Sequence, residues 1–212
     1  MITTNPFSIL SETVPAIATQ SFVIVMAFLV AIGTLLDIIH KKNIKYFFEN
    51  AKKAKKSAKK KLTTGDKTSV IIKTVASDIL TTSELGAGKR RVAHLLGMYG
   101  TILFWLASVI MIFCYASTDS VTPSIWPILW HVGAIMTCLG GYWFWLFLRV
   151  DVYSEAHPWY RIIKADLFVL SLLAAATFGL IWSFLQSSKI NVWDNLFLIL
   201  FIISNVVLFG GV

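Results

Sequence analysis

Long apolar runs separated by short polar segments are the dominant pattern along the chain. A helix that crosses a bilayer needs about 20 consecutive apolar residues, and each run approaches or exceeds that length. The pattern therefore predicts an all-α integral membrane protein, a helical bundle with about five transmembrane helices. These helices are expected at residues 15–36, 92–116, 125–148, 167–185 and 196–212.

Composition supports a membrane protein over a soluble domain. Hydrophobic residues make up 57% of the 212 residues and charged residues 14%, whereas a soluble domain carries about 25% charged residues. The two cysteines, Cys114 and Cys138, both lie in apolar runs. Neither a disulfide framework nor an iron–sulfur or zinc site on this chain is therefore expected.

Positive charge is concentrated in one segment. Of the 19 lysines and arginines, fifteen lie within residues 41–91, and none lies within 117–124. The positive-inside rule therefore predicts an outside N-terminus and a cytoplasmic basic loop, in the inner (cytoplasmic) membrane. Although the net charge is +8, cations clustered beside a span indicate topology and lipid contact rather than nucleic-acid binding.

These features divide the chain into three regions. Residues 1–40 form an N-terminal segment with the first transmembrane helix, and residues 92–212 form a four-helix transmembrane region. The basic cytoplasmic loop, residues 41–91, holds seven lysines within 52–61. Within 70–80, apolar residues at helical spacing predict an amphipathic helix, and Gly86 and Gly88 are expected to end it.

No nucleotide-binding or hydrolytic motif occurs in the sequence. The Rossmann and Walker glycine patterns, GxSxG and HExxH are all missing. The predicted cytoplasmic segments are also too short to build a nucleotide domain. If redox or hydrolytic chemistry is involved, its catalytic centre is therefore expected on another chain.

A histidine inside the third run raises the possibility of haem b. Ionisable groups within a membrane are costly and usually functional, and His131 is expected about 9 Å from the outer end of its helix. Met111 is expected about 8 Å from the same membrane face, and His–Met ligation of haem is chemically acceptable. His94, which precedes the small residues Gly97 and Gly100, is the third candidate haem ligand.

A quinone site is the second chemical option. Such a site needs an apolar slot, a hydrogen-bond donor and a carboxylate that relays protons. At the expected cytoplasmic level the chain offers Asp37, His94, Arg149, Asp151 and Asp166. Each candidate also has a structural interpretation: His131 can hydrogen-bond across the bundle, and Arg149 and Asp151 can form a boundary ion pair.

Two stretches carry a family resemblance. They are SELGAGKRRVAHLLGMYG at 83–100 and WHVGAIMTCLGGYWFWLFLRVDV at 130–152, the latter followed by ADLFVLSLLAAATFGLIW at 165–182. Together they resemble the membrane anchor of dissimilatory adenylylsulfate reductase of sulfur-oxidising bacteria. More distantly, they resemble the membrane part of the quinone-interacting oxidoreductase subunit related to heterodisulfide reductase.

The resemblance implies a membrane anchor and electron-transfer subunit. Such a subunit docks the cytoplasmic flavin and iron–sulfur enzyme that interconverts adenylylsulfate with sulfite and AMP, and it links that enzyme to the quinone pool. Histidines in the spans of the related quinone-interacting subunits bind haem b, and His94 and His131 lie in the matching stretches. The iron–sulfur domain of those larger subunits has no counterpart in this sequence.

Two other functions remain open from the residues alone. One is a b-type cytochrome subunit of another quinone-linked oxidoreductase, with His94 and either His131 or Met111 as haem ligands. The other is a structural or transport membrane protein. Transport is disfavoured because the spans show no obvious inverted repeat and few carboxylates.

Overall fold

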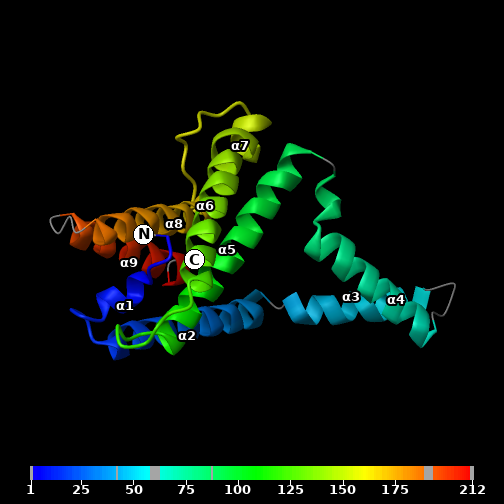
Figure 1. The fold of residues 1–212 in the computed structure, drawn as a ribbon. Helices are drawn as coiled ribbons and strands as arrows, with labels where there is room; N and C mark the ends of the chain where they lie inside the picture. Colours follow the sequence, from blue (N-terminus) through cyan, green and yellow to red (C-terminus); the bar gives the residue numbers. More distant parts are fainter. Residues whose placement is uncertain (1, 42, 58–62, 87, 189–192, 211–212) are drawn as a thin grey trace.

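The apolar runs of the sequence form helices, as seen in a computed structural model that describes residues 2–41, 43–57, 63–86, 88–188 and 193–210 (Figure 1). No β-strand occurs among these residues, so the all-α prediction is confirmed for them. The helices are α1 (Pro6–Leu10), α2 (Ala16–Lys41), α3 (Asn43–Ser57), α4 (Thr64–Thr74), η1 (Val75–Leu80), η2 (Ser83–Leu85), α5 (Lys89–Cys114), α6 (Ile125–Trp143), η3 (Phe144–Leu148), α7 (Val150–Tyr153), α8 (Asp166–Ser187) and α9 (Asp194–Gly210).

Four helical segments are long and apolar enough to cross a membrane. They are α2, α5, α8 and the continuous segment formed by α6 and η3. The shorter apolar helix α9 has 17 residues, the lower end of the range for a spanning helix. The five-span topology and the outside N-terminus remain predictions.

A glycine seam joins α5 and α6 in an antiparallel pair. A Cβ atom added at Gly133 would lie 2.5 Å from the backbone nitrogen of Phe104, and one at Gly140 would lie 2.5 Å from that of Gly97. Glycines at a helix interface let two backbones approach closely. The small residues that the sequence offers after His94 therefore serve helix packing.

Aromatic side chains fill the centre of the bundle. Trp130 and Trp182 are fully buried, and Trp182 stacks on Phe201 of α9 with a ring-centroid distance of 5.9 Å. Phe7 of α1 packs its ring 6.0 Å from Trp130 and 5.7 Å from Trp182. The core therefore joins α6, α8 and α9 to a short helix that precedes the first span.

Asn5 fixes this N-terminal helix against the bundle. Its Oδ1 accepts hydrogen bonds from the backbone N–H groups of Phe7 and Ser8, which caps α1. Its Nδ2 donates to the carbonyl oxygen of Tyr115 at 2.9 Å and to Thr122 Oγ1 at 3.1 Å. One buried amide thus ties the segment before α2 to the loop between α5 and α6.

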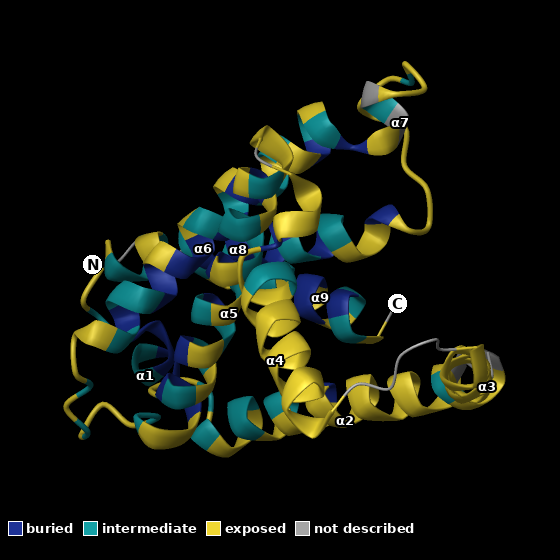
Figure 2. Cartoon of the chain, turned by 90° about the vertical axis from the view of Figure 1, so that its right-hand side faces the viewer, coloured by how far each residue is buried: buried dark blue, intermediate teal, exposed yellow. Residues whose placement is uncertain are grey.

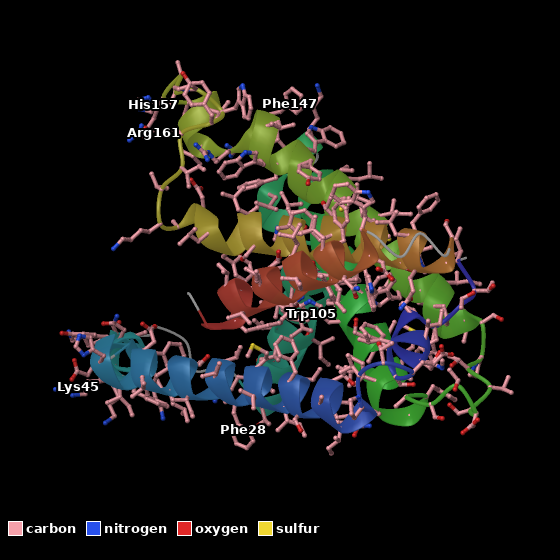
Figure 3. The ribbon with its side chains drawn as sticks, turned by 90° about the vertical axis from the view of Figure 1, so that its left-hand side faces the viewer. Phe28, Lys45, Trp105, Phe147, His157 and Arg161 are labelled. Atoms are coloured by element: carbon pink, nitrogen blue, oxygen red, sulfur yellow. The ribbon has the colours of Figure 1, made fainter. Side chains whose placement is uncertain are left out.

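Helix α2 packs loosely on the rest of the bundle. Only 6% of its most apolar window is buried. Near its N-terminal end, Gln20 Nε2 donates a hydrogen bond to the carbonyl oxygen of Ile112 at 3.1 Å, and Met26 is buried further along. Figure 3 shows Phe28 on the opposite side of α2, pointing away from the bundle.

The basic segment extends away from the bundle. Helix α3 follows α2 but turns away from its axis, because Figure 2 shows α2 along its length and α3 end-on. Helices α3 and α4 lie well to the right of the bundle in Figure 1. Both helices are exposed wherever their side chains are described, as the yellow ribbon of Figure 2 shows. The lysine-rich segment is therefore helical up to Ser57, and its remainder, 58–62, lies outside the described residues.

A capping box begins α4. The Thr63 hydroxyl accepts a hydrogen bond from the Asp66 backbone N–H, and the Asp66 carboxylate accepts one from the Thr63 backbone N–H. Hydrogen bonds from Thr63 to the carboxylate lower the pKa of Asp66. The helical stripe predicted at 70–80 is thus present, as α4 followed by η1.

The end of the basic loop, at Leu80 and Thr81, contacts α5. Tyr99 donates its hydroxyl to the carbonyl oxygen of Leu80, and Arg91 Nε donates to that of Thr81, both at 2.7 Å. Gly86 then adopts a φ of 69°, a left-handed conformation that glycine adopts without strain. The chain therefore turns at the expected glycines before α5 begins.

Candidate functional site

His131 lies in the bundle core with both ring nitrogens engaged. Nδ1 is 2.7 Å from the carbonyl oxygen of Pro127, and Nε2 is 3.0 Å from Ser183 Oγ of α8. A carbonyl oxygen can only accept, so Nδ1 carries the proton and Nε2 of the neutral ring accepts from the Ser183 hydroxyl. An iron at Nε2 would therefore have to replace Ser183.

The other two candidate haem ligands lie at different levels. The glycine contacts set the register of α5 and α6, which places His131 beside Phe104. His94 is ten residues from Phe104 and Met111 seven residues beyond it, or about 15 Å and about 10 Å at the α-helical rise per residue. Two axial ligands must meet at one iron, so the structure does not bring these three residues together.

The two candidate haem ligands on α5, Met111 and His94, also differ in how far they are buried. Met111 is fully buried in the aromatic core. His94 is exposed near the start of the helix. Met111 therefore contributes to packing, and His94 lies on the outer surface of the α5–α6 pair.

Arg149 is buried at the end of α6, where it joins two parts of the chain. Its guanidinium donates to Asp166 Oδ2 at 2.9 Å and to the carbonyl oxygen of Arg161. It also lies 4.1 Å from the centroid of the Trp145 ring, close enough for a cation–π interaction. Arg149 thus ties the loop after α7 and the start of α8 to the end of α6.

Asp166 is thus a carboxylate partner of Arg149. The side chain of Asp151, the residue expected to pair with Arg149 at the boundary, lies outside the described residues. Asp166 is well placed because it also accepts a hydrogen bond from the Ile163 backbone N–H at 2.9 Å.

A local change in helix geometry positions Arg149. The turn Phe144–Leu148 is a π-helix, and the Arg149 N–H donates to the carbonyl oxygen of Phe144, five residues earlier, at 2.8 Å. The wider turn places both Trp145 and Arg149 in buried positions. Sequence periodicity alone gives no signal for this extra residue in the turn.

The candidate quinone residues do not form one cluster around Asp37. Asp37 lies on the exposed part of α2, 17 residues or about 25 Å beyond Gln20, where α2 contacts α5. Arg149 is instead engaged at the junction of α6 and α8. Helix α2, which carries Asp37, lies at the bottom of Figures 1 and 2, whereas α7, which follows Arg149, lies at the top. The structure therefore separates Asp37 from Arg149, and His94 is exposed on a third helix.

A cavity of about 560 Å³ lies between α2 and the bundle. Its walls come from α1, α2, α5 and α9 and are almost entirely apolar, with aromatic rings that include Phe22, Phe104, Trp105 and Phe209. In Figure 3, Trp105 lies between the red α9 and the blue α2. The run pattern gave no indication of this cavity, because α2 was expected to pack as an ordinary member of the bundle.

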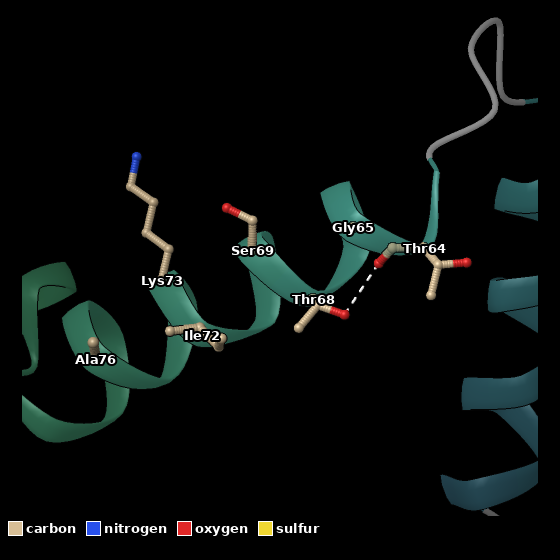
Figure 4. Close-up of a pocket in the computed structure, with 7 residues that line it drawn as sticks. All are labelled: Thr64, Gly65, Thr68, Ser69, Ile72, Lys73 and Ala76. Atoms are coloured by element: carbon tan, nitrogen blue, oxygen red, sulfur yellow. Dashed lines mark hydrogen bonds between the residues drawn. The ribbon is translucent and has the colours of Figure 1, made fainter.

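The surface of α4 is a second candidate region. Figure 4 shows Thr64, Thr68, Ile72 and Lys73 on successive turns of this one helix, with Thr68 donating to the Thr64 carbonyl oxygen at 3.0 Å. Large apolar side chains are also exposed on α4 and η1; they are Val70, Ile71, Ile72, Val75, Ile79 and Leu80. This face of α4 and η1 is open rather than enclosed.

Within the described ranges, no group of three or more His, Cys, Asp or Glu side chains could hold a metal ion. Comparison with known proteins adds no family assignment. No protein-family description, curated protein or solved structure matches the chain. The functional argument therefore rests on the chain's own residues and on the resemblance of its two stretches.

Proposed function

We propose that this chain is a non-catalytic membrane anchor that docks a cytoplasmic redox enzyme and links it to the quinone pool. The segregation of charge is the observation that carries the proposal. An apolar helical bundle fills one part of the molecule, and exposed basic helices extend from it. The resemblance of residues 83–100 and 130–152 points to adenylylsulfate reductase as the docked enzyme.

The basic extension has the electrostatics of a docking arm. Every described side chain of α3 is exposed, including Lys52, Lys53, Lys55 and Lys56. A surface of one charge attracts a partner of the opposite charge and orients it before contact. We infer that an acidic face of the enzyme meets this arm at the cytoplasmic surface.

The adjoining apolar face on α4 and η1 supplies the second component of such a contact. Ile71 and Ile72 are 61% and 62% exposed, and large apolar groups in the centre of an interface give it most of its stability. Charge steering by α3 and apolar burial on α4 would together hold the partner. This division of roles explains why both kinds of surface lie on the same extension.

In this proposal, the redox centres belong to the docked enzyme. His131 forms hydrogen bonds with Pro127 and Ser183, and Arg149 forms one with Asp166. These bonds support a structural role for both side chains. Electrons would pass from the enzyme's own centres to quinone at the membrane face. The anchor's contribution is to hold the enzyme at that face.

Purification from native membranes tests the proposal. A tagged chain extracted in mild detergent at low salt should bring along a soluble flavin and iron–sulfur enzyme, visible by its flavin absorbance and identified by mass spectrometry. High salt should release the enzyme, because exposed charges more than a Debye length apart, about 10 Å at 0.1 M, are screened. A chain that purifies alone at low salt would argue against docking.

A further inference from the structure

We propose that the cavity between α2, α5 and α9 binds the apolar tail of a membrane lipid, an acyl or isoprenoid chain. The proposal stands on the cavity and on the membrane-spanning character of its walls. It does not depend on the docking function, because it requires no partner enzyme.

The position of the cavity determines which molecules can reach it. Two of its walls, α2 and α5, are helices long and apolar enough to cross a membrane. The cavity extends along α2 from Ala18 to Val30, and Leu10 and Val14 line it before α2 begins. In a bilayer this region faces hydrocarbon, where water is scarce. The molecules present at that depth are lipid tails and the tails of lipid-soluble cofactors.

The chemistry of the wall selects a tail over a polar head group. Three polar side chains line the cavity, and each donates within its own helix: Thr19 to Ala16, Ser108 to Phe104 and Asn205 to Phe201, all at backbone carbonyl oxygens. A fourth lining residue, Trp105, has a buried Nε1–H with no hydrogen-bond partner among the described residues. Three engaged donors and a wall made otherwise of aliphatic and aromatic side chains favour an apolar occupant.

The size of the cavity argues against a helix as its occupant. One turn of an α-helix, taken as a cylinder about 10 Å wide and 5.4 Å long, fills about 420 Å³. The cavity volume of about 560 Å³ therefore holds little more than one turn. It falls within the range of small-molecule sites, about 300–1,000 Å³, and suits a flexible chain.

The loose packing of α2 gives such a tail a structural role. Gln20, Val23 and Met26 are among the residues that hold α2 to the bundle, yet only 6% of the most apolar window of α2 is buried. Helix α3 follows directly after α2 (Figure 1). A tail between α2 and α5 would supply the missing side-chain contacts. It would thereby set the position from which the basic helices extend.

Photo-crosslinking in mixed detergent and lipid micelles tests the proposal. Two probes are used on the purified full chain: a phosphatidylethanolamine and a ubiquinone, each with a diazirine in its apolar tail. Labelled peptides are mapped by mass spectrometry, with and without an excess of the unlabelled molecule. We expect competable labelling that maps to the cavity walls on α2, α5 and α9.

Variants that fill the cavity provide the control. Ala27→Trp from α2 and Val109→Trp from α5 place a large ring in the cavity and should remove the competable labelling. Gly33→Trp is the matched control, because an added Cβ there meets no atom within 4 Å and Gly33 does not line the cavity. Size-exclusion chromatography and circular dichroism identify the variants that fold.

Each outcome decides the proposal. Competable labelling by the lipid probe, the quinone probe or both supports it and identifies the source of the tail. Labelling that cannot be competed, or that is spread over the outer faces of α6 and α8, overturns it. Unchanged competable labelling in either folded filling variant also overturns it, and wild-type labelling alone decides the matter if both variants fail to fold.

Discussion

At the scale of single residues, two buried polar side chains of the bundle bond to partners that lie far away in sequence. His131 bonds to Ser183, and Asn5 bonds to Tyr115. A buried polar group is costly when it has no hydrogen-bond partner. These pairings therefore explain why an apolar bundle tolerates a histidine and an asparagine in its interior.

Replacing His131 should weaken the contact between α6 and α8. His131→Phe keeps a planar ring but removes both nitrogens, so Ser183 loses its acceptor. We expect a loss of about 1 kcal/mol in the free energy of unfolding, the usual cost of one interhelical hydrogen bond. Denaturant titration in detergent, followed by circular dichroism, measures the change.

The matched control is His157→Phe, because the His157 side chain is 41% exposed outside the spans. Its unfolding free energy should stay close to that of the wild type. A double variant with Ser183→Ala should cost less than the sum of the two single changes. Equal stability of His131→Phe and wild type would contradict a structural role for this histidine.

The Arg149–Asp166 pair should contribute more than the histidine does. Asp166→Ala removes a hydrogen-bonded carboxylate from a guanidinium that is only 5% exposed, and breaking a buried ion pair costs about 3 kcal/mol or more. Asp194→Ala provides the comparison, because Asp194 is also the first residue of an apolar helix. Melting temperatures in detergent should fall clearly for Asp166→Ala and little for Asp194→Ala, and equal shifts would refute the pairing argument.

At the scale of elements, sequence patterns predicted where helices form better than how they pack. The apolar runs predicted the helices that are long and apolar enough to cross a membrane, because that capacity depends on the length and composition of one segment. The small residues Gly97 and Gly100 also indicated close packing, and the structure places Gly100 against α6. The packing of α1 could not be predicted, because Phe7 meets Trp130 and Trp182 across more than a hundred residues.

A larger residue in the glycine seam should separate α5 and α6. Gly133→Val places a branched side chain where a Cβ already lies 2.5 Å from the Phe104 backbone nitrogen, and such overpacking costs about 1–3 kcal/mol. Gly33→Val on α2 is the control, since nothing lies within 4 Å there. The melting temperature in mild detergent should fall for Gly133→Val only; a similar fall in both variants would exclude the seam as the cause.

Candidate site residues were harder to predict than elements. Sequence identifies His94, His131 and Met111 as chemically able to bind haem, but their arrangement depends on the α5–α6 register that the glycine contacts set. In the same way, Arg149 pairs with Asp166 because a π-helical turn ends α6. The helical periodicity of one segment does not specify the register between two helices. It also gives no sign of an extra residue in one helical turn.

At the scale of the whole molecule, the apolar and basic parts are spatially separate. The bundle buries aromatic rings and paired polar groups, while α3 and α4 are exposed at every described side chain. The distribution of lysines along the sequence predicted this division but not the projection of the basic helices away from the bundle. That projection is what makes a docking function physically reasonable.

Reversing the charge of the arm should abolish docking without affecting the fold. A variant with four lysines of α3 changed to glutamate should lose the enzyme in co-purification, because attraction to an acidic face becomes repulsion. The same lysines changed to glutamine should give an intermediate loss; these lysines are Lys52, Lys53, Lys55 and Lys56. Lys164→Glu, an exposed charge next to α8, should leave co-purification unchanged.

The most direct test of the account is the affinity of purified adenylylsulfate reductase for the chain in nanodiscs of zwitterionic lipid. Such lipid excludes attraction to an anionic membrane surface, so binding reports contact with the protein. The account predicts saturable binding at low salt that weakens steadily as salt is added and is lost in the glutamate variant. Enzyme that fails to bind at low salt, or that binds the wild type and the glutamate variant equally, would contradict the claim that the basic helices dock it.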